Sequence, residues 1–373
     1  MFDLWWTELS FGISFLFNIF LFLFIVLYYR KYVVAPKWEK KNGDIGLILL
    51  ALILIIFTTP LNSDDFFHYQ EKVWKYSPNS SGWTLEPIYD FIIILVNKNY
   101  FAFRLFVWGG AFLFTVNAFK RFGVNKNVAI FFLVAVYLMK FNYARSTLAM
   151  SSYFLGLSFL LRPLPKKRII SVIFSFLFFI GAYSFHHSIL PVIAFTTVAV
   201  IPIDKPIFFL SLLFFVPTFA MLFADYSSYF LDQFDEMDIQ QKMAHYGEVE
   251  AEVGVVSFWG IIRVFLVYAA FFLPIIINTR SIMINRKRID ICILKLFRIM
   301  TAVLLFAAMF LFLGFDNFVF SYRYLFMSFI PLTIITVYLY NKHYIRRWMY
   351  KSIIIMGICS NAFHYLFGLY KCL

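Results

Sequence analysis

Apolar runs long enough to cross a membrane, separated by short basic segments, recur along nearly the whole sequence. A helical span takes about 20 apolar residues, and a chain that is 62% hydrophobic and only 14% charged lacks the polar surface of a soluble domain. We assign apolar segments near 11–29, 45–60, 101–119, 127–141, 146–161, 169–184, 188–202, 206–224, 255–278, 291–313, 322–340 and 352–370. The predicted fold class is therefore all-α, a polytopic integral membrane helix bundle of about 10–12 transmembrane helices.

Several of these segments are shorter than a standard span. We expect those helices to be broken, re-entrant or buried within the bundle, because irregular backbone at membrane depth has to be covered by protein. No internal repeat and no low-complexity linker divides the sequence, so we predict one membrane domain over residues 1–373.

Lysine and arginine alternate between the two ends of the apolar segments. Most of the 33 basic residues fall in 30–44, 120–126, 162–168, 203–205, 279–290 and 341–351, whereas most acidic residues fall in the other connections. The positive-inside rule places the basic connections in the cytoplasm and both termini outside. The net charge of +13 is thus explained by the basic residues of the cytoplasmic connections. The sequence has no basic arm and no groove-reading motif, so we predict no nucleic-acid partner.

Two connections on the predicted outer side are unusually long. We predict that residues 61–100 form an external loop. In its second half we expect an interfacial helix that begins near Thr84, with Pro87 in its first turn. Residues 225–254 form a second external loop, which is acidic. Connections of this length often act as lids or binding loops.

Arg145 stands at the predicted outer mouth of a helix whose face continues through Ala149 and Ser152. Small residues allow close helix approach, and a cation at this depth can hold an anion. The alternative is an arginine that extends to lipid headgroups.

Arg323 enters a late helix at the same predicted face, between Tyr322 and Tyr324. Its guanidinium can grip phosphate in a bidentate manner while the rings stack on sugars. The alternative is an interfacial residue paired with Asp316.

His186 and His187 lie in the turn between two apolar runs, also on the outer side. Neighbours in a helix point about 100° apart, so we expect one to face a cavity while the other packs or reaches the interface. A histidine can bind phosphate or take a proton from a hydroxyl near neutral pH; both can also be plain interfacial residues. Pro191 predicts a bend or a new helix start.

Asp64, Asp65 and His68 lie within one helical turn of each other. They suit a weak divalent-metal site, a general base with its partner, or a solvated helix cap; spacing alone does not support metal, and we predict no cofactor. Glu86, before Pro87, is either a first-turn carboxylate or a substrate contact. Gly-rich phosphate loops, GxSxG, HExxH and cysteine clusters are absent from the sequence.

The sequence resembles the EpsG family of Wzy-type bacterial polysaccharide (O-antigen, exopolysaccharide) polymerases, which suggests a GT-C-like bundle. The resemblance is carried by the stretches DDFFHYQEKVW, LEPIYDFIIILV, ARSTLAMSSYFLGL, PKKR, FHHSILPVI and SYRY. It implies a glycosyltransferase of the bacterial inner (cytoplasmic) membrane that joins undecaprenyl-diphosphate-linked repeat units at the periplasmic or exterior face. Its partners would be these lipid-linked glycans, the bilayer and, as a further candidate, a chain-length regulator protein.

Under this resemblance, cations neutralise the departing diphosphate and a base deprotonates the acceptor hydroxyl. We assign Arg145, Arg323 and His186 to the diphosphate. The candidates for the base are Asp64, Asp65, Glu86 and His187.

Three other functions stay open from the sequence. A polysaccharide or O-antigen ligase differs only in its acceptor. A membrane O-acyltransferase of envelope glycans would need reactive residues on the inner rim, where this chain carries mostly Lys and Arg. A lipid-linked glycan flippase would often show paired broken helices in two halves, and no such pairing is visible.

Overall fold

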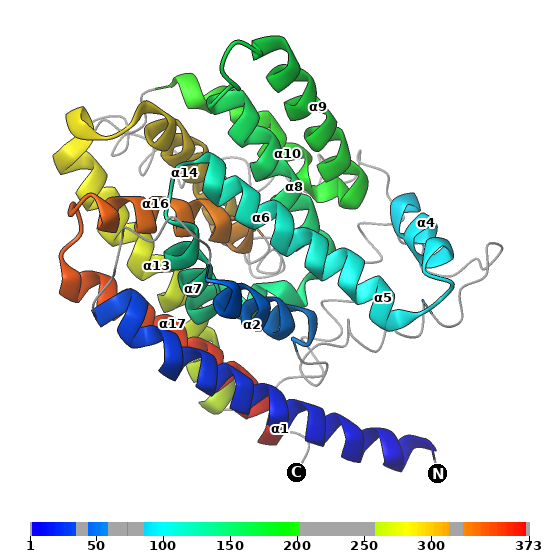
Figure 1. Cartoon of the computed structure of the whole chain (residues 1–373). Coiled ribbons are helices and arrows are strands. Elements are labelled where there is room, and N and C mark those ends of the chain that lie inside the picture. Colours follow the sequence, from blue (N-terminus) through cyan, green and yellow to red (C-terminus); the bar gives the residue numbers. More distant parts are fainter. Residues whose placement is uncertain are drawn as a thin grey trace.

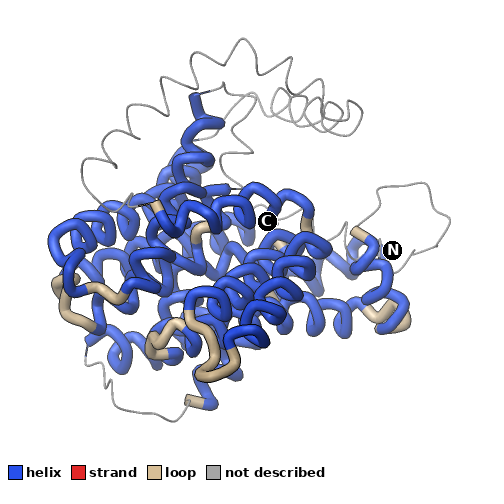
Figure 2. Tube along the Cα trace, turned by 90° about the horizontal axis from the view of Figure 1, so that it is seen from above, coloured by secondary structure: helices blue, strands red, loops and turns tan. Residues whose placement is uncertain are grey.

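The structure, a computed structural model, describes residues 2–34, 44–58, 73, 86–201, 258–312 and 324–370. Within these ranges all regular structure is helical, and Figure 2 shows helices joined by short loops without a strand. The α-helices are α1 (Phe2–Tyr29), α2 (Ile45–Ile56), α4 (Pro87–Leu95), α5 (Tyr100–Arg104), α6 (Gly110–Arg121), α7 (Lys126–Tyr137), α8 (Ala144–Leu161), α9 (Arg168–Phe185), α10 (Leu190–Ala194), α13 (Phe258–Asn285), α14 (Ile291–Phe312), α16 (Phe329–Asn341) and α17 (Arg347–Tyr370).

Five helical stretches are long and apolar enough to cross a membrane by length and composition: Phe15–Val34, Tyr100–Arg121, Arg168–Phe185, Phe265–Arg288 and Ile291–Met309. Three shorter apolar helices accompany them. The predicted polytopic helix bundle is therefore confirmed. Figure 1 shows the helices packed into one bundle, with α17 running back alongside α1.

The short apolar segment 127–141 is a broken helix, as its length predicts. Helix α7 ends at Tyr137 and a 3₁₀ turn, Leu138–Asn142, follows. The side chain of Asn361 in α17 holds this break: its amide donates to the carbonyls of Val134 and Ala135 at 3.2 and 2.9 Å and accepts from the backbone N–H of Met139 at 3.4 Å. The freed backbone groups are thus satisfied inside the bundle.

Two of the differences between observed and expected helix boundaries have a cause in the local sequence. Helix α13 continues to Asn285 and includes Arg280, which we expected in a connection, because no glycine or proline interrupts the chain there. The segment 322–340 breaks at Ser328, and α16 begins at Phe329. Pro331 explains the break, since its ring lacks an N–H and clashes with the carbonyl four residues earlier.

Helices α8 and α9 form a closely packed hairpin, seen side by side in Figure 1. Ser152 of α8 donates to the carbonyl of Phe178 at 2.9 Å. One turn on, a Cβ on Gly156 would lie 2.9 Å from the Cβ of Phe178 and 3.0 Å from the carbonyl oxygen of Ser175. The small residues along this face of α8 therefore permit the close approach that the sequence predicted.

The basic connections gather at one end of the bundle, here called the basic end. It comprises the loops after α1, α6, α8, α13 and α16. Arg162 after α8 pairs with Asp290 before α14 at 2.5 Å, and the N–H of Asp290 donates to the hydroxyl of Tyr338 at 3.1 Å. The N–H of Asp44 donates to Asn127 at the start of α7 at 3.3 Å. These contacts bring together the described parts of five of the six predicted basic connections. Residues 203–205 lie outside the described residues, and the orientation of the loops across the membrane stays a prediction.

Candidate functional site

Three helix termini meet at the end of the bundle opposite the basic end, here called the site end. Glu86 precedes α4, Arg145 lies in the first turn of α8, and His186 directly follows α9. Pro87 occupies the first position of α4, where its missing N–H costs nothing. Helix α9 stops at His186 and α10 starts with Pro191 in its first turn, because that proline prevents a continuous helix.

The carboxylate of Glu86 joins the other two residues, and we call Glu86, Arg145 and His186 the Glu86 cluster. One oxygen, Oε1, lies 2.8 Å from His186 Nδ1; the other, Oε2, accepts from Arg145 Nη1 at 3.3 Å. The Glu86 side chain is only 8% exposed, compared with 25% for Arg145 and 17% for His186. A buried carboxylate thus lies between two partly exposed nitrogen groups.

The environment of Glu86 keeps it ionised. Burial by itself raises the pKa of this carboxyl, but the hydrogen bond with His186 and the charge of Arg145 outweigh burial and lower the pKa to about 2. At neutral pH, Glu86 therefore carries a negative charge and is a weak base. Its position suits it to orient Arg145 and His186 better than to take a proton from a substrate.

The two adjacent histidines have different surroundings. His186 contacts Glu86, whereas His187 is exposed and stacks on the ring of Tyr183 with centroids 4.7 Å apart. The backbone separates them, because His186 is extended and His187 begins a 3₁₀ turn. The structure thus brings His186 into the cluster and leaves His187 beside it.

Several predicted site residues lie outside the described residues. These are Asp64, Asp65, His68, Arg323 and the acidic loop 225–254. The structure describes the chain again from Tyr324, the residue after Arg323. The hydroxyl of Tyr324 donates to the carbonyl of Ser188 at 3.3 Å, and Ser188 lies two residues after His186 in the sequence. The described chain therefore resumes next to the Glu86 cluster, and the role of Arg323 stays a prediction.

Arg104 is a buried cation at the site end that serves the fold. Its guanidinium donates to the carbonyls of Ile56 and Thr58 at 2.7 and 3.0 Å and stacks over Trp108 at 4.2 Å. These carbonyls belong to the C-terminal end of α2, where cations are favoured by the helix dipole. Arg104 thus closes the end of α2.

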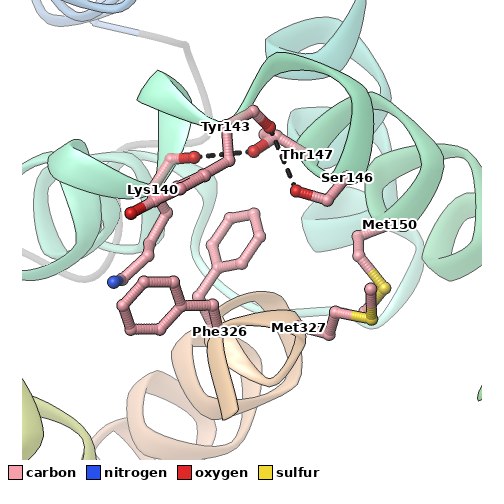
Figure 3. Close-up of a pocket in the computed structure, with 8 residues that line it drawn as sticks. Lys140, Tyr143, Ser146, Thr147, Met150, Phe326 and Met327 are labelled. Carbon is pink, nitrogen blue, oxygen red and sulfur yellow. Dashed lines mark hydrogen bonds between the residues drawn. The ribbon is translucent and has the colours of Figure 1, made fainter. Parts of the chain in front are cut away.

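Lys140 is a buried cation that was not among the predicted site residues. It lies in the 3₁₀ turn after α7, is 2% exposed, and lines a pocket next to the first turn of α8 (Figure 3). A single lysine inside the apolar stretch YLMKF was the available signal, because an ionisable residue at membrane depth is rare and often functional.

The geometry suits anion binding combined with proton transfer. Arg145 offers a guanidinium, and a carboxylate–histidine pair is the arrangement that fixes the tautomer of a general base. Among the described residues, no group of three or more His, Cys, Asp or Glu side chains has the geometry to hold a metal ion.

Comparison with known protein families matches residues 44–371 to the EpsG family. No curated protein and no solved structure matches the chain. The predicted likeness to GT-C-type bundles therefore stays a prediction, whereas the match to the family covers most of the chain and includes all three residues of the Glu86 cluster.

Proposed function

This chain belongs to the EpsG family, which is linked to exopolysaccharide biosynthesis, and from this premise we propose that it is a polysaccharide polymerase. In this proposal it is a membrane glycosyltransferase of the bacterial cytoplasmic membrane. It transfers a glycan from a polyprenyl diphosphate to a hydroxyl of a second lipid-linked repeat unit, at the outer face of the membrane. The observation that carries the proposal is the Glu86 cluster at the end of the bundle opposite the basic loops.

The reaction forms a bond between the acceptor oxygen and the anomeric carbon while the bond from that carbon to the diphosphate breaks. Negative charge builds on the departing diphosphate, so a cation that is fixed in place lowers the barrier. Arg145 fills this role: Glu86 holds it at 3.3 Å, and one quarter of its side chain remains exposed. A fixed guanidinium loses little orientation when it binds phosphate.

The acceptor hydroxyl has to lose its proton in the same step. If His186 donates from Nδ1 to Glu86, then Nε2 is the basic nitrogen of the ring. Glu86 acts here as a positioning residue, since its lowered pKa makes it a poor base. The geometry therefore favours His186 as the base among the described candidates. His187, exposed and stacked on Tyr183, is the weaker candidate.

A gel of the cell-surface glycan tests the proposal. The gene is deleted, the cells are complemented with variants at equal protein level, and the glycan length is compared. Arg145→Ala should lower polymer yield about a hundredfold, the usual effect of losing a group that stabilises transition-state charge, and leave single repeat units. Complete loss of surface glycan would indicate a flippase or ligase, and normal length with a missing ester would indicate an acyltransferase.

Arg162, at the other end of α8, offers a matched control for the Arg145 variant. Arg162 is also paired with a carboxylate, Asp290 at 2.5 Å, but at the basic end. Arg162→Ala removes a comparable ion pair and should leave long polymer. If both arginine variants lost polymer equally, the effect would be general destabilisation and the proposed role of Arg145 would be wrong.

A further inference from the structure

Two basic loops meet at one corner of the basic end. The 3₁₀ turn Arg286–Arg288 follows α13, and residues 342–346 connect α16 to α17. Tyr344 joins the two loops: its hydroxyl donates to the carbonyl of Arg288 at 3.3 Å, and its own carbonyl accepts from Ser281, in α13, at 2.9 Å. Figure 1 shows the connection from α16 to α17 (orange) beside the last turns of α13 (yellow). The cations of both loops therefore belong to one surface.

The fold holds both loops in place. Ile289 and Ile345 are 7% and 3% exposed, and each anchors one loop in the core. The second loop begins with a helix-ending turn: His343 takes the left-handed conformation at φ 58°, and the N–H of Tyr344 donates to the carbonyl of Leu339 at 2.8 Å. The backbone that carries the cations is thus fixed by the protein itself.

Exposed cations line this surface, which we call the basic corner and define by Lys287, Arg288, Lys342, Arg346 and Arg347. The acidic residues described at the basic end are Asp44 and Asp290. They are paired with cations outside the basic corner, Lys31 and Arg162. Like charges held on a fixed backbone repel one another, and a bound anion relieves this repulsion. The basic corner therefore favours an anionic partner.

Exposed apolar side chains adjoin these cations. Ile284 lies one helical turn before Arg288 and is 72% exposed. Ile291 begins α14 and is 56% exposed, and Trp348 in the first turn of α17 is 59% exposed. Tryptophan concentrates where a membrane meets water. Cations beside exposed apolar side chains match a phospholipid, which offers phosphate and hydrocarbon together; an acidic protein segment or a free phosphate would use only the cations.

We propose that the basic corner binds the headgroup of an anionic phospholipid with two phosphates, as in cardiolipin. One phosphate contacts Lys287 and Arg288, and the other contacts the cations of the second loop. Arginine binds phosphate through two parallel hydrogen bonds, and basic pockets between membrane helices on the cytoplasmic side suit such headgroups. The acyl chains lie against the exposed apolar side chains. This inference is independent of the proposed function, because the Glu86 cluster is at the opposite end of the bundle.

Binding of cardiolipin to the purified full-length protein in detergent tests this inference. Phosphatidylglycerol is the comparison lipid, because it carries the same kind of phosphate and acyl chains but only one phosphate. Native mass spectrometry should show cardiolipin bound at least about tenfold more tightly than phosphatidylglycerol, a difference of about 1.4 kcal/mol. Equal affinity for the two lipids would contradict a site that holds both phosphates.

Arg288→Gln combined with Arg346→Gln removes one cation from each loop. A basic residue near a membrane surface contributes a factor of about five to lipid binding, so this double variant should weaken cardiolipin binding about 25-fold. Both side chains are exposed, so the unfolding temperature without lipid should stay unchanged. Trp348→Gln should weaken both lipids alike, because it removes only an apolar contact. If Trp348→Gln bound both lipids normally, the apolar part of the site would be wrong.

Lys120→Gln combined with Lys126→Gln is the matched control. It removes the same charge at the two ends of the loop between α6 and α7, which also lies at the basic end. The apolar side chains of that region, Phe119, Phe122 and Val124, are buried and offer no surface to acyl chains. Cardiolipin binding should therefore be unchanged. Equal loss in the two double variants would mean general attraction to a positive surface and would overturn the inference.

Competition with soluble anions distinguishes the sources of negative charge. Inorganic diphosphate at the concentration of cardiolipin should not displace the lipid, because it lacks acyl chains. If diphosphate or a glutamate-rich peptide displaced cardiolipin at equal concentration, the basic corner would bind soluble anions or an acidic protein, and the inference would be wrong. Arg145→Ala should bind cardiolipin normally, so the loss of polymer and the loss of lipid binding are separable.

Discussion

At the scale of single residues, the proposed chemistry depends on one carboxylate shared by two nitrogen groups. Glu86 is nearly buried, and an ionised carboxylate in such a place is stable only when it is paired and hydrogen-bonded. Arg145 and His186 supply both interactions at 3.3 and 2.8 Å. In return, Glu86 fixes the positions of Arg145 and His186, the proposed anion-binding and proton-transfer groups.

The lowered pKa of Glu86 predicts how the fold responds to acid. Because the folded-state pKa of about 2 is below the ordinary 4.5, the ionised carboxylate stabilises the fold at every pH above about 4.5, and this contribution is lost as pH falls toward 2. The contribution of this carboxylate to the free energy of unfolding is at most about 3 kcal/mol. The difference in thermal unfolding temperature between wild type and Glu86→Gln should be present at pH 5 and shrink as the pH falls below 4.5.

Measurements in detergent at a series of pH values check this expectation, with Asp290→Asn as the control. That variant removes a carboxylate from an ion pair at the basic end, where Asp290 is 35% exposed compared with 8% for Glu86, and an ion pair that is more open to water contributes less. A Glu86→Gln difference that grows as the pH falls from 4.5 toward 2 would contradict the assigned charge state of Glu86.

The two histidines should be unequal in function. His186→Ala removes the partner of Glu86 at 2.8 Å, whereas His187→Ala removes a ring stacked on Tyr183 at the surface. We expect about a hundredfold loss of polymer for His186→Ala, the scale of a lost general base, and a much smaller loss for His187→Ala. Glycan gels at matched protein level compare the two variants. Equal losses would indicate that both histidines are plain interfacial residues.

Sequence reasoning at this scale found the residues but not their pairing. Arg145 and His186 were predicted because an ionisable residue beside a membrane span is unusual. The contact with Glu86 joins positions 59 and 100 residues apart, and no local pattern encodes such a distance. Lys140 was missed as a buried residue for the same reason: the rings of Phe271 and Phe326 that cover it come from distant segments.

At the scale of helices, small residues position the site. Arg145, Ala149, Ser152 and Gly156 recur along one face of α8, and α9 packs closely enough there to bring His186 next to Arg145. The spacing of Ala149 and Ser152 predicted that another helix approaches this face closely, and the structure shows that this helix is α9. The break of α7 was predictable only from its length, because the residue that holds it, Asn361, comes from α17.

Gly156→Ala should destabilise the hairpin. The new methyl group would lie 2.9 Å from the Cβ of Phe178 and 3.0 Å from the carbonyl oxygen of Ser175, so backbone has to move. We expect a loss of about 1–3 kcal/mol, seen as a lower unfolding temperature, and reduced polymer because Arg145 and His186 separate.

Gly110→Ala in α6 is the matched control for that substitution. Its new methyl group meets only the Cδ1 of Leu148 at 3.8 Å, an ordinary contact. Because alanine favours a helix over glycine by about 1 kcal/mol, stability should be unchanged or slightly higher. If both variants lost stability alike, close packing of α8 on α9 would not be what positions the site.

At the scale of the whole molecule, charge and chemistry lie at opposite ends. The loops after α1, α6, α8, α13 and α16 are joined by contacts such as Arg162–Asp290 and Asp44–Asn127, while the Glu86 cluster lies at the ends of α4, α8 and α9 far from them. The alternation of lysine and arginine along the sequence predicted this arrangement. The positive-inside rule then predicts that the cluster faces outward, where lipid-linked glycans are joined in the proposed function.

Cysteine labelling at the two ends of α9 tests that orientation. Lys166 just before α9 and His187 just after it are both exposed, so a cysteine at either position is open to reagent. In a background that lacks Cys292, Cys359 and Cys372, His187→Cys should react with a membrane-impermeant maleimide in intact cells. Lys166→Cys should react only after the cells are permeabilised, because the positive-inside rule predicts that the basic loop faces the cytoplasm. The reverse pattern would place the Glu86 cluster inside the cell, where Arg145 would meet nucleotide-activated donors, and a polymerase acting at the outer face would be excluded.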